Sequence, residues 1–117
     1  MALSAQIVLL FVANRLYVGT GNTVYSLDMS LATYPASLAL TIDPGYNITG
    51  MSYIGDQINI YASNGSHGLQ FKWNGGDVTT PSGQLTRIFW YDKPIINIAN
   101  LNNIDYLVTG HSGRRAF

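Results

Sequence analysis

Apolar and polar positions follow one another in the same order three times along the chain. Each time there is an apolar strand, a two-residue polar turn, a second strand rich in Tyr, Val and Ile, and a turn that contains Gly. The three segments are residues 7–21, 48–65 and 96–113. Short runs of this kind between turn residues are typical of antiparallel hairpins. The pattern therefore predicts an all-β chain built on a repeated hairpin.

The first turn of each hairpin marks the period of the repeat. These turns are Ala13-Asn14, Gly55-Asp56 and Asn102-Asn103, so that successive turns begin 42 and 47 residues apart. Asn, Asp and Gly tolerate the positive φ that tight hairpin loops require. A period of about 40 to 50 residues is the length of one β-propeller blade.

Two further strands are expected after each hairpin. Third strands fall at residues 23–28 and 68–74, and a third one begins at residues 114–117. Fourth strands fall at residues 37–42 and 84–90. The expected unit is therefore a four-stranded antiparallel sheet, which is the strand number of a propeller blade.

The repeat also predicts the domain organisation. We expect one all-β repeat domain over residues 1–117, with units at about residues 5–43, 44–92 and 93–117. The third unit stops as its third strand begins, so the domain is expected to be partial and to leave an open strand edge along residues 104–108. Open edges of this kind recruit other chains.

The stretch NRLYVGTGNTVYSLD (residues 14–28) resembles the strand-turn-strand signature of β-propeller repeats such as the quinoprotein-like and kelch-like families. The resemblance is one of pattern, covers about two and a half units, and implies about two and a half propeller blades. No Trp-Asp dipeptide or Gly-Gly doublet recurs in all units, so the subfamily stays open. The Asn-rich turns are similar to propeller segments of phage tail-associated and other surface proteins. A β-sandwich or β-prism is the alternative fold.

Composition supports strands and excludes several functions. All six acidic residues are Asp, and the only lysines are Lys72 and Lys93, whereas exposed helix faces are usually rich in Glu and Lys. Six basic residues balance the six acidic ones, and only Arg114 and Arg115 are adjacent, so no basic stripe predicts nucleic acid as a partner. There is no cysteine for a disulfide or a thiolate metal site.

The apolar run at residues 7–13 raises the question of a membrane segment. A spanning helix needs about 20 apolar residues, which is far more than this run offers. A signal peptide would carry basic residues before the run, but residues 1–6 carry no charged side chain. We therefore expect a buried strand at Ile7–Val12 and no membrane insertion.

The loops after the second and fourth strands of a meander lie on one rim, and they gather the candidate ligand-binding residues. Sugars bind by stacking on aromatic rings while amide and carboxylate groups take up their hydroxyls. The candidates for such a site are Asn64, His67, Trp90, Tyr91, Asp92 and His111.

A metal site or an active site is not expected. Zinc takes three or four ligands, and beside His67 and His111 these loops offer only Asp43 and Asp92. Every Asp is expected in or beside a turn, where capping of a local amide explains it. Ser66 and His67 are sequence neighbours whose side chains point to different sides, so they do not form a nucleophile and base. The prediction is no catalytic residue, no metal, no cofactor and no enzyme activity.

These observations favour a non-enzymatic structural or interaction module. The expected module is a propeller segment of a larger or oligomeric assembly, with a virion or the extracellular surface as the favoured location. Its expected partners are other copies of itself or further blades of a parent protein. The alternative is a carbohydrate-binding, lectin-type propeller whose partner is a glycan.

Overall fold

A computed structural model of the chain describes residues 6–34, 36–74 and 85–110, and in these ranges every regular element is a β-strand. The strands form three antiparallel sheets. The expectation of an all-β chain is confirmed. His111 and the third strand expected at residues 114–117 lie outside the described residues.

Sheet A and sheet B are four-stranded meanders, each with its strands in sequence order. Sheet A consists of β1 (Ile7–Val12), β2 (Arg15–Thr20), β3 (Thr23–Asp28) and β4 (Ala36–Thr41). Sheet B consists of β5 (Asn47–Ile54), β6 (Gln57–Ser63), β7 (Gly68–Trp73) and β8 (Leu85–Tyr91). Sheet C is described as one hairpin, β9 (Ile95–Leu101) and β10 (Ile104–Thr109). The expected third strand at residues 23–28 has the predicted bounds, and the fourth strands differ from the expected ones by one residue.

The hairpin turns lie where the repeat predicts them. Ala13, Gly55, Asp56, Asn102 and Asn103 all have positive φ, between 53° and 66°. Gly tolerates this region without cost and Asn and Asp visit it locally, whereas Ala13 must adopt it with a Cβ. Turn chemistry therefore fixes the register of all three hairpins.

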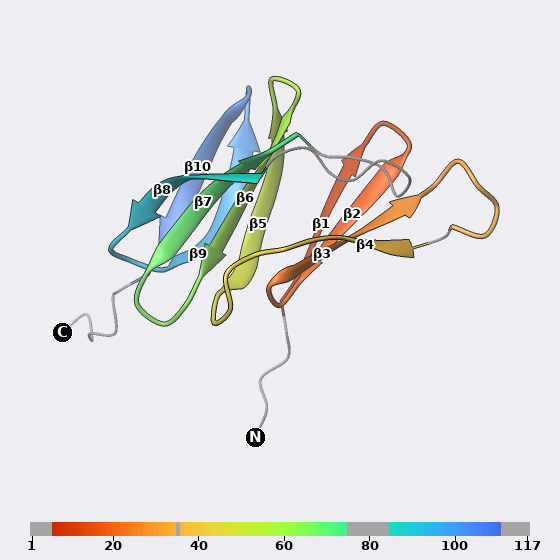
Figure 1. Ribbon diagram of the computed structural model, residues 1–117. Coiled ribbons are helices and arrows are strands. Elements are labelled where there is room, and N and C mark those ends of the chain that lie inside the picture. The colour runs from red at the N-terminus through yellow and green to blue at the C-terminus, as the bar shows by residue number, and fades with distance from the viewer. Residues whose placement is uncertain (1–5, 35, 75–84, 111–117) are drawn as a thin grey trace.

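The three sheets lie side by side, with sheet B between the other two (Figure 1). The first strands of the sheets are neighbours, because β1 contacts β5 and β5 contacts β9. Two glycines permit this approach. A Cβ on Gly19 would lie 2.9 Å from the side chain of Ile48, and one on Gly50 would lie 2.7 Å from that of Ile98.

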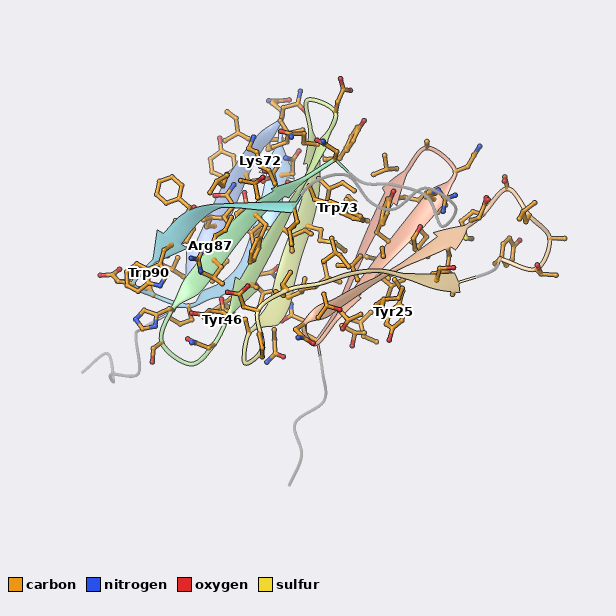
Figure 2. The ribbon with its side chains drawn as sticks, viewed as in Figure 1. Tyr25, Tyr46, Lys72, Trp73, Arg87 and Trp90 are labelled. Carbon is orange, nitrogen blue, oxygen red and sulfur yellow. The ribbon has the colours of Figure 1, made fainter. Side chains whose placement is uncertain are left out.

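The main core fills the space between sheets A and B. Tyr17 and Val24 of sheet A pack against Ile60, Phe71 and Trp73 of sheet B, and each of the five is at most 4% exposed. The rings of Tyr17 and Trp73 meet edge to face, with their centroids 5.3 Å apart. Figure 2 shows Trp73 on the side of sheet B that faces sheet A. The apolar alternation of the second and third strands therefore forms one shared core.

The space between sheets B and C is filled differently. Sheet B turns buried polar side chains toward the hairpin, among them Asn59, Tyr61 and Ser63. The Ser63 hydroxyl donates to the Ile95 carbonyl oxygen at 2.7 Å and accepts from the Ile95 amide at 2.5 Å. This double hydrogen bond ties the start of β9 to the end of β6.

Sheets A and B repeat each other even in their irregularities. The register of β3 with β4 shifts between Val24 and Tyr25, and that of β7 with β8 shifts between Gln70 and Phe71. These two positions are equivalent, since Val24 pairs with Gly19 on β2 and Gln70 pairs with Tyr61 at the corresponding place on β6. A bulge at the same place bends the outer strand of both sheets.

Candidate functional site

Three connections that the sequence assigns to one rim meet around a hollow of about 530 Å³. The β4–β5 connection contributes Gly45, the β6–β7 connection contributes Asn64 and Gly65, and the β8–β9 connection contributes Pro94. Thr49 and Ser63 add hydroxyl groups from strands β5 and β6. Ile95 and Ile96 of β9 also line the hollow, so polar and apolar groups both border it.

Asn64 has a structural task at this rim. Its side-chain Oδ1 accepts from the backbone amides of Ser66 at 2.8 Å and His67 at 2.6 Å. The backbone amide of Asn64 donates to the His67 carbonyl oxygen. An Asx turn of this type holds a short loop in one conformation. The Oδ1 atom of Asn64 is therefore engaged inside the loop, and the loop presents His67 in a defined position.

His67 and Trp90 lie against each other. Their ring centroids are 4.6 Å apart with the planes tilted by 33°. Trp90 comes from the edge strand β8 and is 53% exposed. In Figure 2, Trp90 lies at the left and Tyr25 of sheet A lies at the right. The structure therefore brings Asn64, His67 and Trp90 together in one rim cluster, in which the half-exposed indole ring of Trp90 lies beside the Asn64 loop.

Tyr91 and Asp92 are not part of that cluster. Neighbouring residues of a strand point to opposite faces, and Tyr91 lies on the face opposite to Trp90, where its ring stacks on Phe89 at 5.2 Å. Asp92 lies in the exposed β8–β9 turn. The sequence places the three residues together because they are adjacent, but the pleat of β8 separates Trp90 from Tyr91.

A second group of polar residues, which the sequence pattern does not single out as a site, lies between sheets B and C. The carboxylate of Asp105 on β10 accepts from the Ser52 hydroxyl at 2.5 Å, the Tyr61 hydroxyl at 2.6 Å and the Asn100 amide at 2.7 Å. The expectation that every Asp lies in or beside a turn to cap a local amide is wrong here. Asp105 is a strand residue, and two of its three donors come from the neighbouring sheet.

The chain of hydrogen bonds continues across sheet B. The Gln70 amide donates to the Tyr61 hydroxyl at 3.1 Å, and the Tyr91 hydroxyl donates to the Gln70 carbonyl oxygen at 2.8 Å. Burial, together with the hydrogen bond to Asp105 and its negative charge, raises the pKa of Tyr61 well above its usual range. Burial and then the charge of Asp105 raise the pKa of Tyr91 in the same direction. Both phenols are held in the neutral, donating form.

This network lines a second hollow of about 360 Å³, which Asn59 and Lys72 also border. The Asp105 carboxylate accepts three hydrogen bonds here, from Ser52, Tyr61 and Asn100. The geometry of the network is that of a buried polar contact between sheets.

Within the described ranges no three His, Asp, Glu or Cys side chains gather in a way that could hold a metal ion. The same residues include no helix long and apolar enough to cross a membrane.

Comparisons with known proteins return no match: no family model, no curated protein and no solved structure resembles the chain.

Proposed function

We propose that this chain is a non-enzymatic structural or interaction module, a run of β-propeller-type blades that works as part of a larger or oligomeric assembly. The observation that carries the proposal is the repeated packing step. Sheet B lies against sheet A and sheet C lies against sheet B through the same strands, with β1, β5 and β9 as neighbours in both steps. Blades of a propeller pack in this manner around a central axis.

The exposed surface supports the same proposal. Among the described residues the two end sheets carry large apolar side chains that are more than half exposed, such as Phe11 on β1 and Tyr106 on β10. Contiguous apolar patches of this kind mark interaction surfaces. A virion or extracellular surface is the setting we propose, on the resemblance of the Asn-rich turns to phage tail-associated and other surface proteins.

The test is the mass of the full chain in solution, measured by light scattering coupled to size exclusion. A structural module with open end sheets is expected as an assembly of several times the chain mass of 12.8 kDa. A monodisperse species of one chain mass that unfolds cooperatively would contradict the proposal.

Carbohydrate binding is the second candidate function, and the contact between His67 and Trp90 favours it. An exposed indole beside a polar loop is a suitable platform for the apolar face of a sugar. Glycan-array binding should then disappear in Trp90→Ala. Phe89→Ala is the matched control, because Phe89 is 58% exposed on the opposite face of the same strand. Equal binding by both variants would exclude a sugar site at Trp90.

A further inference from the structure

The outer face of sheet A has no covering element among the described residues. Residues of β1, β3 and β4 point outward there, and their side chains are between 40% and 65% exposed: Ile7, Leu9, Phe11, Tyr25 and Leu38. The strand pairing places Leu16 and Val18 of β2 on the same face. None of the seven side chains carries a charge, so this is a continuous apolar sheet face.

The outer face of sheet C has the same character. Leu101, Ile104, Tyr106 and Val108 are between 52% and 60% exposed. Leu101 pairs with Ile104, and Tyr106 pairs with Ala99 on the same face. Among the described residues, the outermost sheets A and C therefore both present an uncharged apolar face.

The repeat assigns different roles to these two faces. Counting from the hairpin turns, Tyr106 on β10 corresponds to Tyr17 on β2, and Tyr17 points toward the covering sheet B. On the other side, Val18 of the outer face of sheet A corresponds to Ile60, which packs toward sheet A from sheet B. The outer face of sheet C is thus a face that receives the next sheet, and the outer face of sheet A is a face that packs onto a preceding one.

We propose that the outer face of sheet A in one copy packs on the outer face of sheet C in a second copy, head to tail. This inference rests on the proposed function and names its partner. It continues the step by which sheet B follows sheet A and sheet C follows sheet B. Neither interface inside the chain joins two like faces. In both, the face that corresponds to the Tyr17 side of sheet A meets the face that corresponds to the Ile60 side of sheet B. A head-to-tail contact repeats from copy to copy and gives a ring or an open filament.

Two single variants block one face each. Leu9→Glu places a charge in the middle of the outer face of sheet A, and Tyr106→Glu does the same on sheet C. Each variant alone is expected as a monomer of 12.8 kDa, because every head-to-tail contact needs both faces. An equimolar mixture is expected to form a 1:1 heterodimer of twice that mass, because the first variant keeps its sheet C face and the second keeps its sheet A face.

Controls keep the result interpretable. Far-ultraviolet circular dichroism and a cooperative melt show that each variant is folded, and Leu38→Glu with Val108→Glu repeats the design at other exposed positions. Phe89→Glu adds the same charge outside both faces and should assemble like the wild type.

The possible failures are distinguishable. If the Leu9→Glu variant still forms dimers alone, the contact joins two like faces and the head-to-tail inference is wrong. If the mixed variants remain monomers while the wild type assembles, the inference is wrong and the proposed function stands. A monomeric wild type rejects both.

Discussion

The interface between sheets A and B and the interface between sheets B and C differ in the polarity of their side chains. Sheets A and B meet through aromatic and aliphatic side chains around Trp73, whereas sheets B and C combine apolar contacts of Ile95 and Ile98 with a hydrogen-bond network around Asp105. Burial of apolar area is favourable wherever shapes fit, while a buried polar network is favourable only if every member finds its partner. The first interface therefore supplies stability, and we infer that the second fixes how the hairpin sits on sheet B.

Removing Trp73 tests the apolar interface and has the largest expected effect. Trp73→Ala should lower the free energy of unfolding by about 3 to 5 kcal/mol, since it removes a fully buried ring and leaves a cavity. Trp73→Phe is the control. The indole Nε1 has no hydrogen-bond partner among the described residues, so this variant loses only volume and should cost less. Urea denaturation measures both, and an unchanged midpoint for Trp73→Ala would show that the packing described for sheets A and B is wrong.

Removing the carboxylate of Asp105 tests the polar interface. Asp105→Ala leaves the buried hydroxyls of Ser52 and Tyr61 without their acceptor, and each such loss costs about 1 to 3 kcal/mol. Asp105→Asn keeps one acceptor oxygen and should cost less. Asp92→Asn, in an exposed turn, should stay within about 0.5 kcal/mol of the wild type in the same denaturation series. Equal stability of Asp105→Ala and Asp92→Asn would mean that the network does not hold the hairpin.

Alkaline pH should weaken the polar interface specifically. Because the pKa of Tyr61 is raised in the folded state, the folded chain keeps a proton that the unfolded chain loses above pH of about 10. Stability is therefore complete below that pH and falls above it, by up to about 1.4 kcal/mol per pH unit for this group. Tyr61→Phe should flatten the decline in denaturation curves recorded across that range. The same slope in Tyr61→Phe and wild type would assign the decline to other groups.

A polar contact at the surface should matter least. Arg87 of β8 lies 3.5 Å from Asp43 in the β4–β5 connection, and both side chains are about half exposed, at 55% and 45%. Exposed pairs of this kind contribute about 0 to 1 kcal/mol and are screened by salt. Arg87→Ala should therefore change the midpoint of thermal unfolding only slightly. A loss as large as that of Asp105→Ala would break the distinction between buried and exposed polar contacts.

Local signals explain what the sequence could predict. Turn residues and two-residue periodicity locate strands and hairpins, because both depend on neighbours in the chain. The second strand of each predicted hairpin is present, and Tyr17, Ile60 and Leu107 lie on these strands, β2, β6 and β10. The expected buried strand has the predicted bounds, Ile7–Val12, but the expectation of burial is wrong for every second residue: Ile7, Leu9 and Phe11 are between 61% and 65% exposed, because they point away from sheet B.

The polar network could not be predicted in the same way. Its bonds to Asp105 connect residues 44 and 53 positions apart, and no local rule pairs them. One signal was present, since Asp105 occupies the position that Leu16 and Ile58 hold in the first two units. A charged residue at an apolar repeat position indicates a different neighbour. Of the candidate ligand-binding residues, the structure brings together Asn64, His67 and Trp90 and turns Tyr91 away.

The serial order of the sheets also sets where the molecule opens first. In the part of the chain that the structure describes, sheet B is covered on both sides, whereas sheets A and C are each covered on one. In stacked repeats stability spreads only through nearest neighbours, so local opening starts at the ends. Amide protons of β6, such as that of Ile60, should then exchange with solvent last, and those of β10 early. A further copy packed on sheet A or sheet C would cover that sheet, and its amide protons would then exchange more slowly.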